Sequence, residues 1–261
     1  MVPAVAWSLS NNGWRPTAVG YAGIILLLGL PLSFVIKNKP EDIGLVPDGI
    51  ANKDIVKQQI SNELTAQEAV HTRAFWLIAF GHSTALMIVF AVMVHLVIYL
   101  KEDLGFSLEK AGTVFVLLTT FTILGQLMGG YLGDRVNKRL LASLAMLGHA
   151  VGLLILVFAK NYNWIILFSV FHGLAWGLRG PIMQALRAEY FGRKAFGQIM
   201  GYSMPILTIG IATGPLIAGY LADKFGSYQN GFLVLAALAA LGSLFFAFAN
   251  PPKKQVSAQF S

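Results

Sequence analysis

The sequence predicts an all-α integral membrane protein with about seven transmembrane helices. Of its 261 residues, 56% are hydrophobic and 12% are charged, which is about half the charged fraction of a soluble domain. Each helical span needs about 20 apolar residues. The apolar runs of this sequence are unbroken, which indicates helices rather than barrel strands. Seven such runs lie near residues 17–36, 74–100, 111–132, 140–159, 164–186, 197–221 and 230–249.

The distribution of Lys and Arg predicts the orientation of these spans. The net charge is +7, and its basic residues lie in short loops, which favours membrane orientation over nucleic-acid binding. Thirteen Lys and Arg fall on one side, in segments 37–73, 134–139, 187–194 and the tail, against five on the other. We expect the 38–73 linker and the C-terminus in the cytoplasm and the N-terminus outside. The lipid bilayer, as the cell (inner) membrane, is therefore the first expected partner.

The first elements of the chain are a span and a polar linker. The opening MVPAVAWSLSNNGWR lacks the basic start of a signal peptide and is too short to cross a membrane. We interpret residues 1–37 as the end of a preceding span followed by one complete span. In the 38–73 linker, Thr65-x-x-Glu68 has the spacing of a capping box and is expected to open the next helix.

Two similar stretches divide the remaining spans into two units. LMGGYLGDR (127–135) and LIAGYLADK (216–224) are identical at five of nine positions, 89 residues apart, and Asp134 corresponds to Asp223. Each copy closes an apolar run in a three-span unit, 74–159 or 164–249, which is followed by the cytoplasmic tail 250–261. An odd number of spans per unit places the copies on opposite membrane faces, so the pattern predicts an inverted repeat.

The loop after the first copy resembles a motif of the major facilitator superfamily. GGYLGDRVNKR (129–139) is similar to its pattern G-x-L-x-D-R-x-G-R-R, and Asn137 replaces the second glycine as a residue that tolerates a left-handed turn. The resemblance implies a gate at this loop, with Asp134 and Arg135 as its charged residues; a solvated basic loop is the alternative. The matching positions are Gly130, Asp134, Arg135, Lys138 and Arg139.

Further stretches resemble the monocarboxylate and oxalate/formate-type members of that superfamily. They are GWRPTAVGY, KPEDIGLVPDG, ALRAEYFGRKAFGQIMG (185–201) and GPLIAGYLADKFGSY (214–228). The resemblance covers the whole chain but only the second half of such a transporter, from span six to span twelve. It implies a six-helix bundle of two inverted three-helix repeats preceded by one extra span, with a missing N-terminal half or a second chain as partner.

An arginine lies inside the apolar run 164–186, in the stretch HGLAWGLRGP (172–181). A charge near the centre of a span costs about 2.5–3.5 kcal/mol, so we expect Arg179 to face a wet cavity or a partner. The resemblance implies that this span lines the central cavity, and Arg179 is a candidate ligand for a substrate carboxylate or for an acid of the missing half. Alternatively, it snorkels toward the cytoplasm. Its helical face also carries Phe168, His172, Trp176 and Met183.

The first span of the bundle, 74–100, has two candidate faces. Thr84, His95 and Tyr99 share one face, and His82 lies on nearly the opposite one. Only one face can line a cavity, and the sequence leaves that choice open. A histidine here is suited to carry a coupling proton, with a purely structural role as the alternative. Elsewhere, glycines four residues apart predict close helix packing: Gly125, Gly129 and Gly133, Gly197 and Gly201, and Gly210 and Gly214.

These observations together favour the second half of a secondary transporter. We expect it to move a small solute, an organic anion such as a monocarboxylate, by alternating access. A truncated, transport-inactive fragment is one alternative. A seven-helix receptor is another, disfavoured by the repeat and by the absence of cysteine and of N-P-x-x-Y. The sequence holds no metal cluster, P-loop or nucleophile constellation, so it predicts no enzyme, cofactor or metal.

Overall fold

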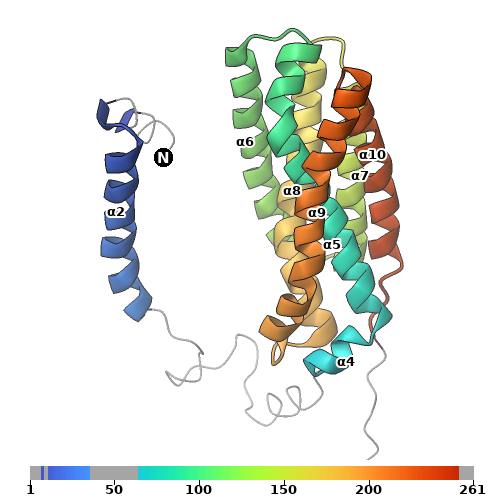
Figure 1. Cartoon of the computed structure of the whole chain (residues 1–261). Helices are drawn as coiled ribbons and strands as arrows, with labels where there is room; N and C mark the ends of the chain where they lie inside the picture. The colour runs from blue at the N-terminus through green and yellow to red at the C-terminus, as the bar shows by residue number, and fades with distance from the viewer. Residues whose placement is uncertain (1–6, 9–10, 36–63, 253–261) are drawn as a thin grey trace, which may run out of the picture. The chain divides into compact units, whose positions relative to one another are not determined.

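A computed structural model describes residues 7–8, 11–35 and 64–252 of the chain (Figure 1). Seven of its helices are long and apolar enough to cross a membrane, which confirms the predicted number of spans. The described residues contain no strand. The spans are α2 (Trp14–Val35), α5 (Arg73–Ile98) with its π-helical end η2 (Tyr99–Asp103), α6 (Leu108–Gly133), α7 (Lys138–Val157), α8 (Tyr162–Phe191), α9 (Phe196–Phe225) and α10 (Gln229–Ala247).

The chain divides into two compact units, residues 1–59 and 60–261. In the first unit, α2 is a single helix whose described side chains are exposed except for Thr17 and the half-buried Tyr21. The Thr17 hydroxyl lies 2.8 Å from that of Ser8 and donates to the carbonyl of Gly13. A helix that is apolar on all sides is typical of a membrane span. The expected linker segment 38–63 lies outside the described residues.

In the second unit, α5–α10 form a bundle with internal two-fold character (Figure 1). Helix α8 packs between α6 and α7, α5 packs between α9 and α10, and α7 lies against α10. Exchanging the first three helices for the last three therefore maps each of these pairs onto another of them, or onto itself. Asp134 ends α6 at the bundle end where Lys138 meets Glu189, whereas Asp223 lies near the opposite end, where Asp103 meets Ser227. This placement agrees with the inverted repeat.

Glycines allow the closest helix pairs to touch through their backbones. A Cβ atom built on Gly129 of α6 would lie 2.6 Å from the Leu178 carbonyl oxygen of α8, and one on Gly214 of α9 would overlap the Met87 carbonyl of α5. The predicted small-residue packing is thus confirmed for these pairs. In contrast, a Cβ on Gly197 or Gly201 would meet nothing within 4 Å.

The Thr65 capping box is present, but it opens a helix of its own. Thr65 accepts a hydrogen bond from the Glu68 backbone N–H (3.2 Å), and the Glu68 carboxylate accepts one from the Thr65 N–H (2.8 Å). The hydrogen bonds that the Glu68 carboxylate accepts from Thr65 lower the pKa of that carboxyl. The five-residue α4 (Ala66–Val70) follows, and α5 then begins at a second N-cap, Thr72. The prediction that the box opens the next helix is confirmed, and that helix is the short α4, because Thr72 is extended (φ −85°, ψ 142°) and separates it from α5.

Candidate functional site

Five basic side chains lie together inside the bundle, and we call them the interior basic cluster. All five are at most 8% exposed. Helix α5 contributes one, α7 one and α8 three, so both repeats take part. The members are His82, His149, His172, Arg179 and Arg187.

Within the cluster, His149 of α7 and His172 of α8 form a direct pair. Their Nδ1 atoms are 3.1 Å apart, and their rings meet edge to face with centroids at 4.5 Å. One Nδ1–H donates and the other Nδ1 accepts, so the accepting imidazole is neutral. The Nε2 atoms of both rings are buried and have no hydrogen-bond partner. The pair therefore offers at least one unused N–H donor to the interior.

A second polar contact in the cluster joins α8 to α5. Arg187 Nη2 donates a hydrogen bond of 2.9 Å to His82 Nδ1. An arginine has no acceptor, so His82 Nδ1 carries no proton and the imidazole is neutral. The Nη1 atom of Arg187 is buried without a partner, and the whole side chain is 2% exposed. Arg187 is therefore held by one amino group while the other remains available.

Arg179 lies in the cluster without any hydrogen bond to a described residue. It is 3% exposed, and its Nε atom is buried without a partner. It lies on α8 between His172, seven residues earlier, and Arg187, eight residues later. An uncompensated buried charge carries a large desolvation penalty, so this arrangement favours an added anion.

No acidic side chain in the described part of the chain balances these two arginines. An ion pair among the described residues, Lys138–Glu189, lies at the end of the bundle. The described acids all lie outside the helix centres, near helix ends or in turns: Glu68, Glu102, Asp103, Glu109, Asp134, Glu189 and Asp223. The bundle interior therefore has an excess of positive charge.

Three other sequence-predicted candidates, Trp176, Thr84 and Tyr99, make packing or backbone contacts within the bundle. Trp176 is half-buried and packs against the core. Thr84 donates to the Phe80 carbonyl of its own helix (2.9 Å). Tyr99 is buried, and its hydroxyl points to the Leu156 carbonyl of α7 (3.4 Å). The hydroxyls of Thr84 and Tyr99 therefore already have partners in helix backbones, and whether these three residues contact a solute stays a prediction.

His95 belongs to a separate group at the other end of α5. Its Nε2 lies 3.0 Å from the Pro215 carbonyl of α9, and its ring stacks on Tyr228 with centroids 4.8 Å apart. Asp103 closes this end by accepting hydrogen bonds from Ser227 Oγ (2.6 Å) and the Tyr228 N–H (2.8 Å). Burial, together with the nearby charges of Glu102, Asp223 and Asp103, raises the pKa of Tyr228. Asp223 itself is exposed.

The predicted gating loop has well-defined contacts. Asp134 is the exposed C-cap of α6, and its carboxylate makes no hydrogen bond or ion pair with a described residue. Arg135 lies over the Tyr131 ring at 3.7 Å. Lys138 pairs with Glu189 at 2.8 Å, and Arg139 donates to Asn250. At Gly130, an added Cβ would meet nothing within 4 Å. Lys138 and Arg139 thus connect the start of α7 with α8 and with the chain after α10.

One detail of this loop differs from the expectation. Asn137 has φ −56° and ψ 114°, outside the left-handed region, and its side chain accepts hydrogen bonds from the backbones of Arg139 (3.0 Å) and Leu140 (3.3 Å). The left-handed interpretation is therefore wrong. Asn137 is the N-cap of α7, because its short carbonyl side chain can satisfy the free N–H groups of the first turn.

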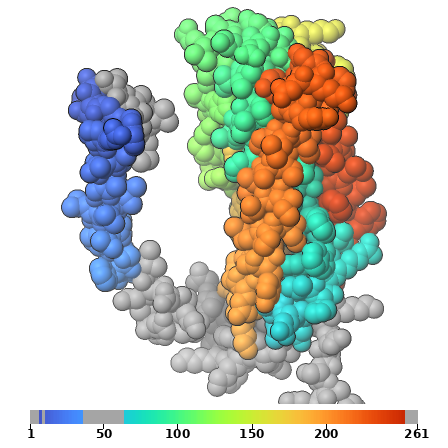
Figure 2. Space-filling model, in the orientation of Figure 1, coloured from blue at the N-terminus to red at the C-terminus, as the bar shows by residue number. Residues whose placement is uncertain are grey.

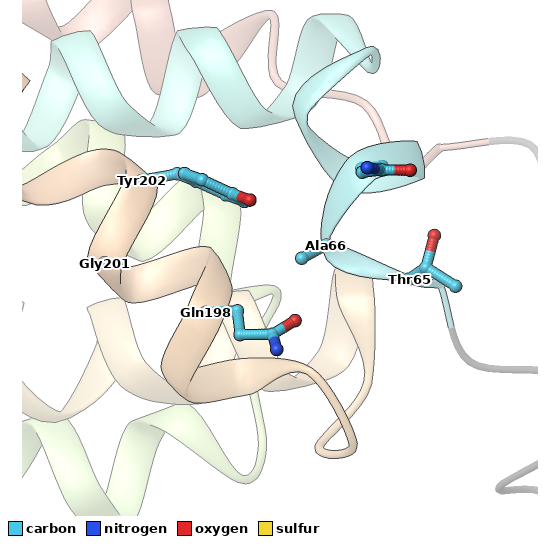
Figure 3. A pocket seen from close by; sticks show the side chains of 6 residues that line it. Thr65, Ala66, Gln198, Gly201 and Tyr202 are labelled. Atoms are coloured by element: carbon cyan, nitrogen blue, oxygen red, sulfur yellow. The ribbon is translucent and has the colours of Figure 1, made fainter.

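A surface cavity of about 600 Å³ lies between α4 and the start of α9 (Figure 3). In Figure 3, Gln198 and Tyr202 extend from α9 toward the α4 turn that carries Thr65 and Ala66. The lining side chains are neutral, and none belongs to the interior basic cluster. This cavity therefore offers no charge for recognising an anion.

Sequence comparison connects the chain with a transporter family. The family model described as the Major Facilitator Superfamily matches residues 78–260. The cis,cis-muconate transport protein of Acinetobacter baylyi is 24% identical over 235 residues, covering 88% of this chain and 55% of that protein. Monocarboxylate transporter 12 of Rattus norvegicus is 22% identical, covering 99% of this chain and 58% of that protein. The chain thus spans about half the length of these relatives.

Structural comparison supports the same fold. The crystal structure of the fucose:proton symporter of E. coli matches with a TM-score of 0.65 at 16% sequence identity. The match covers 94% of this chain and 56% of that one. The arrangement of α5–α10 is therefore a known transporter architecture, and it agrees with the family predicted from the loop motif.

Proposed function

The chain belongs to the major facilitator superfamily, and from this premise we propose that it acts in secondary active transport of a small organic anion. It is an integral membrane protein with seven candidate spans. The solute would cross by alternating access, as the bundle rocks against a second bundle supplied by an N-terminal half or by another chain. The cell membrane, with the linker and the C-terminus in the cytoplasm, is the proposed location.

The observation that carries this proposal is the interior basic cluster without a described acid. Arg179 and Arg187 are 3% and 2% exposed and have unused N–H donors. Guanidinium groups bind carboxylates through charge-assisted hydrogen bonds, which gain strength away from water. Two of the relatives are named for carboxylates, muconate and monocarboxylates, and this supports the same class of solute.

Among the individual residues, we propose Arg179 as the main contact for the carboxylate and His172 as its neighbour. Access requires α8 to open, because Arg179 is almost fully enclosed. Pro181 lies inside α8 two residues later and cannot donate to the Gly177 carbonyl, which weakens the helix there. Trp176 stays a candidate for lining the path, as do Thr84, His95 and Tyr99 on the other helices.

The loop after α6 is the proposed gate. Its exposed Asp134 has no partner among the described residues, whereas its basic neighbours are already engaged. Asp134 is thus available to pair with the second bundle in one state and to release it in the other. The transport-inactive fragment remains the second candidate, because the chain covers about half of its relatives' length.

Uptake of a labelled carboxylate into liposomes that contain the purified chain tests the proposal. We expect saturable uptake that Arg179→Gln abolishes and that Arg193→Gln leaves unchanged, because Arg193 is exposed after the end of α8. Full activity of the Arg179 variant would remove Arg179 from the site. No uptake by the unmodified chain, with the bundle folded, would favour the inactive-fragment alternative.

A further inference from the structure

We propose that the interior basic cluster selects a doubly charged anion, with Arg179 and Arg187 each binding one anionic group and His82 positioning Arg187. This inference rests on the proposed function and deepens it, because it specifies the charge of the preferred solute. It also assigns roles to Arg187, which the sequence placed among the loop charges, and to His82, whose helical face the sequence left open as a cavity lining.

The first argument is a count of charge. His82 accepts a hydrogen bond from Arg187 and is neutral, and one of His149 and His172 accepts a hydrogen bond from the other and is neutral too. The two arginines therefore supply two permanent positive charges, which no described acid balances. An anion with one charge would leave one buried guanidinium without a counter-ion, and a dianion would compensate both.

The second argument is the supply of hydrogen-bond donors. Arg179 has a free buried Nε–H, and Arg187 has a free buried Nη1. The two residues are eight positions apart on α8, a rise of about 12 Å between their Cα atoms. At 100° per residue they lie about 80° apart around the helix, and both side chains are buried in the bundle. Each arginine can thus engage a different end of one small molecule.

The third argument concerns the contact that holds Arg187 in place. A long basic side chain near the end of a span normally snorkels toward water. Here the 2.9 Å hydrogen bond to His82 of α5 ties the guanidinium to the interior. Because this bond uses Nη2, it leaves Nη1 unpaired for a ligand. His82 thus acts through Arg187, as a positioning residue.

Equilibrium binding to the purified full chain in lipid nanodiscs tests this proposal. The probes are matched pairs with the same number of carbons: succinate with butyrate, and adipate with hexanoate. We expect each dicarboxylate to bind at least about tenfold more tightly than its monocarboxylate. Arg187→Gln should weaken dicarboxylate binding to the monocarboxylate level, and Arg193→Gln should preserve the preference.

A second set of variants separates the two roles. His82→Leu removes the acceptor for Arg187 and should reduce the dicarboxylate preference while leaving monocarboxylate affinity unchanged. His82→Gln offers a carbonyl acceptor and should restore most of the preference. If thermal unfolding shows that the Arg187→Gln variant is not folded, the Arg187→Lys variant is used in its place. It keeps the charge but loses the planar fork, and it should weaken the preference in part.

The outcomes distinguish this inference from the proposed function. Equal affinity for both members of each pair, or a preference that survives Arg187→Gln, would overturn the dianion proposal and leave anion transport standing. A dicarboxylate preference without uptake into liposomes would support the inference and contradict transport by this chain. Binding of neither class would overturn both.

Discussion

Replacing Arg179 with methionine should stabilise the unliganded chain while abolishing its anion binding. Arg179 is 3% exposed, and no described residue hydrogen-bonds to it. A charge near the centre of a membrane span costs about 2.5–3.5 kcal/mol, and replacing buried ions with apolar side chains of similar size often stabilises proteins by about 1–4 kcal/mol. Methionine is unbranched and adapts to the same space. We therefore expect the free energy of unfolding to rise by about 2–3 kcal/mol.

Reversible unfolding in mixed detergent micelles, followed by circular dichroism, measures this change. Arg193→Met is the matched control, because its exposed side chain should alter stability by less than about 0.5 kcal/mol. Saturating dicarboxylate should raise the stability of the unmodified chain but not that of the Arg179 variant. A loss of more than about 1 kcal/mol in the Arg179 variant would refute the reasoning, since it would mean that the guanidinium has a stabilising partner in the unliganded bundle.

Three further predictions concern the ends and the packing of the bundle. Gly214→Ala should cost about 1–3 kcal/mol, because the added methyl meets the α5 backbone, whereas Gly201→Ala, in open space, should not destabilise the fold; thermal unfolding compares them. Asp103→Asn removes a negative charge that raises the pKa of Tyr228, so ultraviolet titration should show that tyrosine ionising at lower pH. Lys138→Gln should change stability by less than about 1 kcal/mol in denaturant titrations, since its carboxylate partner is half exposed.

The number, order and class of the helices were predictable from the sequence, because a bilayer imposes a minimum length of apolar residues on every span. The repeated LMGGYLGDR and LIAGYLADK stretches also indicated the two-fold character of the bundle. The local sequence signals for the starts of helices predicted the structure less completely. The Thr65 box was recognised, but a second cap seven residues later divides the predicted helix start in two. Asn137 was recognised as a turn residue, but it caps α7 instead of adopting a left-handed conformation.

Helical periodicity on α8 placed His172 and Arg179 on one face, and both residues lie in the interior basic cluster. The hydrogen bonds within the cluster join residues of different helices: His149 is 23 residues from His172, and His82 is 105 residues from Arg187. Arg187 had been counted among the loop charges, because the apolar run ends at residue 186. In the structure α8 continues to Phe191, which carries Arg187 into the bundle.

By itself, the sequence determined that the chain spans a membrane as two related groups of three helices. Apolarity and helical periodicity are properties of each helix alone, so they can be seen without knowing how the helices pack. Only the tertiary structure decided which face of α8 packs on α6 and which face of α5 packs on α9, because the glycines of α6 and α9 let those helices approach closely. The two arginines of α8 consequently lie with three histidines and no described acid. Their charges and free donors could be counted only after distant helices had been brought together.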